Sequence, residues 1–123
     1  MRIEDTTNRF PNALTLIAEI FPYLEDDFFV KKLHSKMQNL ISAYIKSGNP
    51  AEEASVAQYY LIEKLISDTD GILELLELIN YLGKTKKTTP LLLASRSLLD
   101  LKLEFLKLKN GLVVDLKKKE ASM

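Results

Sequence analysis

The sequence has 123 residues, of which 46% are hydrophobic and 28% are charged, and its formal net charge is zero. This composition is typical of a globular chain of single-domain size. We therefore expect one domain over residues 1–123, with residues 1–10 and 117–123 frayed at its ends. The absence of cysteine excludes disulfides, thiolate nucleophiles and cysteine-based metal sites.

The apolar residues recur with helical spacing along the whole chain. A first helix is predicted over about residues 11–24, and Pro22 should end or kink it. A second helix is predicted over about residues 26–47, because the acids at 25–27 favour a helix start and Gly48 favours a helix end. The inner stripes are Ala13, Ile17, Ile20 and Leu24 in the first helix, and Phe29, Leu33, Met37, Leu40 and Tyr44 in the second.

The third helix has the clearest start signal, the segment NPAEE at residues 49–53. Asn49 is the predicted N-cap and Pro50 the first helical residue. The helix can run to Leu82, with Gly83 as its C-terminal cap. The segment SDTDG at residues 67–71 interrupts the apolar face, and a glycine inside a helix costs about 1 kcal/mol, so a kink or break there is left open. The predicted inner face includes Ala54, Ala57, Leu61, Leu65, Ile72, Leu75, Ile79 and Leu82.

A fourth helix is predicted to open with Thr89 as N-cap and Pro90 as its first residue, and residues 110–111 (Asn-Gly) could cap its end. Four amphipathic helices with short connections predict an all-α fold, an elongated antiparallel up-down-up-down four-helix bundle. The predicted core stripe of the fourth helix has heptad spacing and comprises Leu91, Ala94, Leu98, Leu101, Phe105, Leu108 and Leu112.

A second leucine stripe lies beside the first on the fourth helix. A bundle helix buries about three of every seven positions, so this stripe has apolar surface left over. Such patches usually mark interfaces, and most soluble oligomers are homo-oligomers. A fourth helix that lies centrally within the monomer is the competing interpretation. The candidate residues for contact with another copy are Leu92, Leu99, Leu103 and Leu106.

Two features suggest a phosphate-binding or catalytic site, but the surrounding residues do not match either kind of site. The segment GKT at residues 83–85 resembles the end of a phosphate-binding P-loop, but Leu78 occupies the position of the first glycine and no strand precedes it. His34 is the only histidine and follows the core residue Leu33, so we expect a surface or boundary side chain. One histidine cannot supply the Glu-x-x-His pairs of a di-iron bundle. The sequence predicts no catalytic, cofactor-binding or metal-binding residue, and no enzyme.

Charge is distributed unevenly. Residues 1–80 contain 13 acids and 7 bases, whereas residues 81–123 contain 4 acids and 10 bases. The asymmetry can reflect solvated helix faces, or a basic side that meets nucleic acid or an acidic partner. The candidate contacts for nucleic acid on the 84–119 side are Lys84, Lys86, Lys87, Arg96, Lys102, Lys107 and Lys109, followed by the lysines at 117–119.

The N-terminal segment MRIEDTTNRF lacks the apolar core of a signal peptide, and no run of about 18 uncharged apolar residues is present. A cytoplasmic protein without a membrane-spanning segment is therefore expected.

Three features carry a resemblance over about residues 12–110: Phe-Pro at 21–22 followed by acids, a long third helix ending in Tyr-Leu-Gly at 81–83, and a short polar turn before the fourth helix. This layout resembles the four-helix-bundle proteins encoded in intervening sequences of bacterial large-subunit rRNA genes, and their relative, the accessory variability determinant of diversity-generating retroelements. The resemblance implies a ring-like homo-oligomer, with basic residues presented to a reverse transcriptase and nucleic acid. We expect a non-catalytic interaction or accessory protein that self-associates, with nucleic-acid binding as the alternative.

Overall fold

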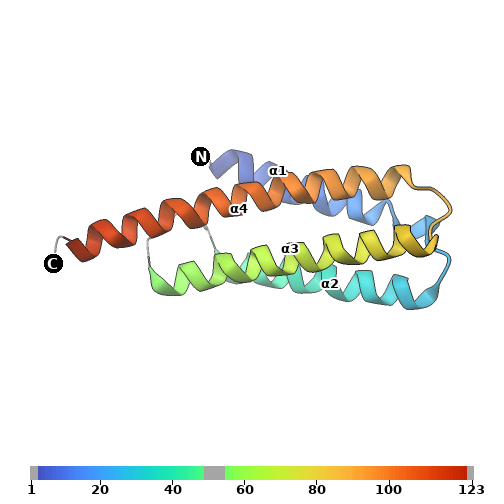
Figure 1. Ribbon diagram of the computed structural model, residues 1–123, viewed down its shortest axis with the longest axis horizontal. Helices are drawn as coiled ribbons and strands as arrows, with labels where there is room; N and C mark the ends of the chain where they lie inside the picture. The colour runs from blue at the N-terminus through green and yellow to red at the C-terminus, as the bar shows by residue number, and fades with distance from the viewer. Residues whose placement is uncertain (1–2, 49–54, 122–123) are drawn as a thin grey trace.

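The computed structural model describes the backbone of residues 3–48 and 55–121, and the side chains from residue 8 onward within these ranges (Figure 1). It contains four α-helices, α1 (Ile3–Ala18), α2 (Asp27–Ser47), α3 (Val56–Leu82) and α4 (Thr89–Ala121), with a short 3-10 helix, η1 (Phe21–Tyr23), between α1 and α2. The helices alternate in direction along an elongated bundle, and α4 projects past the others at its C-terminal end (Figure 1). The predicted all-α four-helix fold is confirmed.

Helix α1 begins at Ile3, so the predicted start near Pro11 is wrong and Pro11 lies inside the helix. The ring of Phe10 is buried and stacks on Tyr44 of α2, with 3.8 Å between ring centroids. This contact anchors the turn before the proline to the bundle. Helical backbone therefore occupies most of the segment 1–10 that we expected to be frayed.

Helix α2 has nearly the predicted bounds. The carboxylate of Asp26 accepts a hydrogen bond from the backbone N–H of Phe28 at 2.9 Å, which caps the N-terminus. At the other end Gly48 has a φ of 63°, a conformation that glycine adopts without steric cost.

Helix α3 begins at Val56, where the hydroxyl of Ser55 accepts a hydrogen bond from the N–H of Gln58 at 3.1 Å. The predicted cap at Asn49 and Pro50 lies outside the described residues. The helix continues without a break through residues 67–71. Thr69 is buried there and its hydroxyl donates to the carbonyl of Leu65 at 2.7 Å, so the polar segment packs as part of the helix.

Helix α4 begins at Thr89 and continues to Ala121. The predicted cap at residues 110–111 is therefore wrong, and so is the frayed backbone expected from residue 117 to residue 121. The apolar stripe explains the continuation, because Leu112 is buried and Leu116 packs against the core beyond Gly111.

The core lies between the four helices and includes the predicted residues Leu98, Leu101 and Phe105, all fully buried. The predicted inner face of α3 needs correction, because Ala57 and Leu82 are exposed and Ala54 lies outside the described residues. Close backbone contacts join α3 to both α2 and α4. Its buried face is accordingly wide and comprises Ile62, Leu65, Thr69, Ile72, Leu75, Leu76 and Ile79.

Candidate interaction surface

The segment GKT forms the C-terminal cap of α3 and the start of a loop. Gly83 has a φ of 65° and a ψ of 34°, and its N–H donates to the carbonyl of Asn80 at 3.1 Å. The N–H of Lys84 donates to Ile79 at 3.0 Å, which completes a Schellman motif. The N–H of Lys86 donates to Tyr23 at 2.8 Å. These three N–H groups are therefore unavailable to cradle a phosphate, in agreement with the capping role predicted for Gly83.

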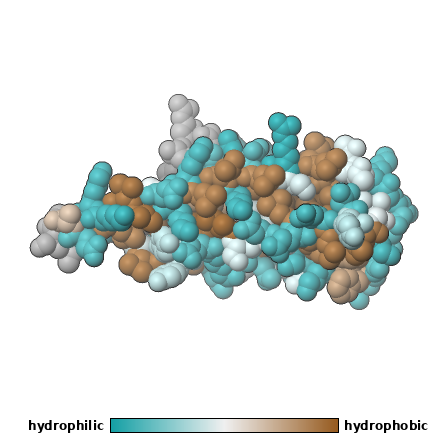
Figure 2. Space-filling model, in the orientation of Figure 1, coloured by the Kyte–Doolittle hydropathy of each residue, from teal (hydrophilic) through white to brown (hydrophobic). Residues whose placement is uncertain are grey.

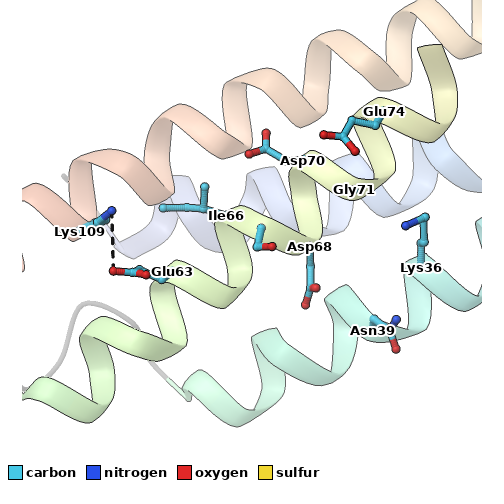
Figure 3. A pocket seen from close by; sticks show the side chains of 10 residues that line it. Lys36, Asn39, Glu63, Ile66, Asp68, Asp70, Gly71, Glu74 and Lys109 are labelled. Atoms are coloured by element: carbon cyan, nitrogen blue, oxygen red, sulfur yellow. Dashed lines mark ion pairs between the residues drawn. The ribbon is translucent and has the colours of Figure 1, made fainter. Parts of the chain in front are cut away.

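A polar groove of about 550 Å³ follows the outer side of α3 (Figure 3). Lys36 and Asn39 reach it from α2, and Lys109 reaches it from α4. Three of its four carboxylates, those of Glu63, Asp68 and Asp70, have a cationic partner within 4.0 Å. The lining contains no histidine or cysteine, and the remaining lining residues are Glu63, Ile66, Ser67, Asp70, Gly71 and Glu74. Within the described residues, no group of three or more His, Cys, Asp or Glu is arranged to hold a metal ion.

His34 is exposed, and its ring meets the ring of Phe21 edge-on with 6.4 Å between centroids. This exposed position agrees with the surface or boundary side chain that the sequence predicted.

Four leucines of α4 form the most extended apolar feature that the sequence singled out, which we call the leucine strip. Leu92, Leu99 and Leu103 are 57%, 51% and 56% exposed, and Leu106 is half-buried. Successive helical residues are about 100° apart, so these four lie within roughly 60° of one another around α4. Hydrophobic side chains follow the course of α4 on the molecular surface (Figure 2). Helix α4 packs against both α1 and α3, yet about half of the surface of Leu92, Leu99 and Leu103 stays exposed.

The basic side chains predicted to contact nucleic acid are not gathered in one place. Lys102 pairs with Asp70 at 2.8 Å, and Lys109 lies 4.0 Å from Glu63 and 5.5 Å from the centre of the Tyr59 ring. These two basic residues of α4 are thus paired with acids of α3 within one chain.

The remaining basic residues divide between distant parts of the molecule. Lys84, Lys86 and Lys87 lie in the loop before α4, and the ammonium of Lys87 is 5.1 Å from the centre of the Tyr23 ring. Residues 117–119 lie near the far end of α4, about 45 Å away at 1.5 Å per residue. Arg96 is exposed between these two ends.

Glu104 of α4 is a buried carboxylate that no sequence pattern indicated. Its Oε1 lies 3.5 Å from a guanidinium nitrogen of Arg9 and 3.6 Å from the ammonium of Lys107. Its Oε2 is buried without a hydrogen-bond partner among the described residues. From sequence alone, a glutamate in an amphipathic helix is expected to be exposed to solvent. The burial of Glu104 depends on where α1 packs, which the sequence pattern of α4 does not contain.

Two tyrosines have altered acidity. A hydrogen bond to the Glu63 carboxylate raises the pKa of Tyr59, and burial raises the pKa of Tyr44. Both causes favour the neutral phenol, so neither residue is prepared to act as a phenolate.

No match was found among protein-family models, curated proteins or solved structures. No helix within the described ranges combines the length and hydrophobicity needed to cross a bilayer.

Proposed function

We propose that this protein is a non-catalytic interaction module that self-associates through the leucine strip of α4. The observation that carries the proposal is the exposure of Leu92, Leu99 and Leu103 on one line of a helix whose opposite face forms the core. Contiguous apolar surface of this kind usually marks a protein contact. The resemblance of the sequence to the rRNA intervening-sequence and retroelement accessory proteins is a second argument for self-association.

The expected strength follows from the exposed area. Burying a leucine side chain fully is worth about 1.5–3 kcal/mol, so burying the exposed half of one is worth about 1 kcal/mol. Three such leucines on each of two copies contribute about 6 kcal/mol, whereas association costs at least about 4 kcal/mol in lost freedom of motion. The strip alone supports only weak association, and contacts around it must contribute to a stable assembly.

Light scattering at tens of micromolar tests the proposal. The wild-type protein should have a mass above the 14.0 kDa of one chain. The double variant Leu99→Glu with Leu103→Glu should keep its helix content by circular dichroism and become monomeric, because the carboxylates would be desolvated in the contact.

Leu78→Glu with Leu82→Glu is the matched control, since these α3 leucines have the same i, i+4 spacing and are also about half exposed. The control should retain the wild-type mass. A wild-type mass of 14.0 kDa would refute self-association. Dissociation of both double variants would show that the strip has no special part in it.

Nucleic-acid binding is the alternative, and the loop lysines favour it. Lys84, Lys86 and Lys87 lie together in six residues between two helices, beyond the reach of the α3 acids that neutralise Lys102 and Lys109. Fluorescence anisotropy with short RNA and DNA at several salt concentrations tests it. An interaction module should show no binding, whereas phosphate contacts would give an affinity that falls linearly with salt on logarithmic axes. Replacing the three loop lysines with alanine should then reduce that slope.

A further inference from the structure

An acidic strip lies on α3 beside the leucine strip. Glu63, Asp70, Glu74 and Glu77 fall within roughly 60° of one another around that helix, at 100° per residue. The ion pairs Asp70–Lys102 at 2.8 Å and Glu63–Lys109 at 4.0 Å join this strip to α4. Figure 3 shows Asp70 and Glu74 projecting from α3 on the side of the α4 ribbon. The leucine strip therefore has an acidic edge along α3.

The opposite edge of the leucine strip carries two bases, Arg96 and Lys107, and one exposed acid, Asp100. Arg96 lines a groove of about 440 Å³ together with Asn12, Thr15 and Leu16 of α1, so it lies on the side of α4 away from α3. Lys107 follows Arg96 by 11 residues, about three turns, and belongs to the same edge. Its side chain is 68% exposed although it approaches Glu104. Across this face the order is an acidic strip, the leucines, and an edge on which two bases outnumber one acid.

The charges of this face are only partly balanced within one chain. Among the described residues, Arg96, Glu74 and Glu77 form no ion pair. These three exposed side chains can therefore pair with a second copy without breaking an existing pair.

The ion pairs also fix the relative height of residues on the antiparallel helices α3 and α4. On antiparallel helices, residues at the same height have residue numbers with a constant sum. In both the 70–102 pair and the 63–109 pair this sum is 172. Arg96 is therefore level with position 76, between Glu74 and Glu77. Lys107 is level with position 65, about 3 Å along the axis from Glu63 at 1.5 Å per residue. Each base has an acid of the opposite edge at nearly its own height, whereas Asp100 is level with position 72, between Asp70 and Glu74.

Symmetry decides which way two copies can meet. A two-fold rotation about an axis parallel to the helices exchanges the two edges, so the acidic strip of each copy faces the edge with Arg96 and Lys107 of the other, and the leucine strips face each other. A two-fold axis across the helices places each edge against itself, so acids face acids. Like charges across an interface disfavour that arrangement. A closed two-fold contact is also the commonest form of self-association.

We infer that two copies associate in parallel about a two-fold axis that runs along the bundle. Their leucine strips are in contact, and Arg96 and Lys107 of each copy lie against the acidic strip of the other. This inference rests on the proposed self-association and adds the orientation, the stoichiometry and the residues that select the partner.

Cross-linking of single-cysteine variants tests the orientation, because the chain has no native cysteine. Leu92→Cys and Asn110→Cys are 18 residues apart, which is five turns, so they share one face about 27 Å apart. In the parallel dimer a short bismaleimide should cross-link each variant to itself, and a mixture of the two should give no more mixed product than chance pairing allows. In an antiparallel dimer only the mixture should cross-link efficiently.

Charge reversal tests the edges. Arg96→Glu alone, or Glu74→Arg with Glu77→Arg, should each raise the dissociation constant about tenfold, in keeping with the modest strength of exposed ion pairs. The triple variant that carries all three changes should regain the wild-type constant, because the exchanged charges face each other again. If these residues had a purely structural role, the losses of dimer affinity would add up in the triple variant and the wild-type dissociation constant would not be regained.

Light scattering separates the two proposals. A mass of 14.0 kDa would refute the self-association itself. Twice that mass with cross-linking confined to the mixture would refute only the parallel orientation, and a larger assembly would refute the two-fold stoichiometry. Twice that mass with self-cross-linking of both variants and recovery in the triple variant would support the whole arrangement.

Discussion

Truncation of Phe105 to alanine tests the packing of α4 most directly. Phe105 is fully buried and belongs to the stripe that also contains Leu98 and Leu101. A phenylalanine buries roughly 150–250 Å², which corresponds to about 4–6 kcal/mol at about 25 cal/mol per Å². Alanine keeps part of this area and leaves a cavity, so we expect Phe105→Ala to lower the free energy of unfolding by about 3–5 kcal/mol. Domains of this size have about 5–15 kcal/mol in total, so the variant should be close to unfolded.

Urea denaturation followed by circular dichroism measures this loss. Wild type and variant should be compared at one protein concentration, because self-association makes apparent stability depend on concentration. Leu93→Ala is the control on the same helix, since Leu93 is 48% exposed and should lose about 1 kcal/mol or less. A loss below about 1 kcal/mol for Phe105→Ala, or equal losses for the two variants, would refute the assignment of the core stripe.

Three further predictions concern single sites. An added Cβ meets no atom within 4 Å at either Gly83 or Gly111, but only Gly83 has a positive φ. Gly83→Ala should therefore destabilise the protein by about 1 kcal/mol, whereas Gly111→Ala should stabilise it by about 0.5–1 kcal/mol. Thermal unfolding measures both changes. Arg9→Ala should cost about 1–3 kcal/mol in urea denaturation because it weakens the pairing of buried Glu104, whereas Glu104→Leu should be neutral or stabilising; a larger loss from Glu104→Leu would contradict this account. Because burial raises the pKa of Tyr44 in the folded state, its contribution is complete below about pH 10 and is lost as the pH rises through the folded-state value, so Tyr44→Phe should show a shallower alkaline loss of stability than wild type.

The sequence by itself determined the local features of this protein. Helical periodicity located the inner stripes that contain Ile17, Leu33 and Phe105, because burial along a helix repeats every 3.6 residues whatever its neighbours are. The cap at Gly83 could also be predicted, since a left-handed residue after a helix favours glycine for steric reasons that involve only nearby backbone. The leucine strip could be predicted from the same periodicity, because its leucines lie outside the positions that a helix of a four-helix bundle buries in the core.

Helix length was decided by packing between distant residues. Phe10 stacks on Tyr44, 34 positions later in the chain, and this contact supports helical turns on both sides of Pro11. Helix α3 likewise continues through Gly71, and helix α4 through Gly111, because tertiary packing outweighs a propensity cost of about 1 kcal/mol.

The arrangement of charges depended on the tertiary structure for a different reason. The net charges of the two parts of the sequence cannot tell whether Lys102 meets solvent, nucleic acid or a carboxylate. The register between α3 and α4 sets Lys102 against Asp70 and Lys109 against Glu63. That register is fixed by the packing of two helix faces. It places the acidic strip of α3 beside the leucine strip of α4, and no pattern within either helix alone predicts that the two strips are neighbours.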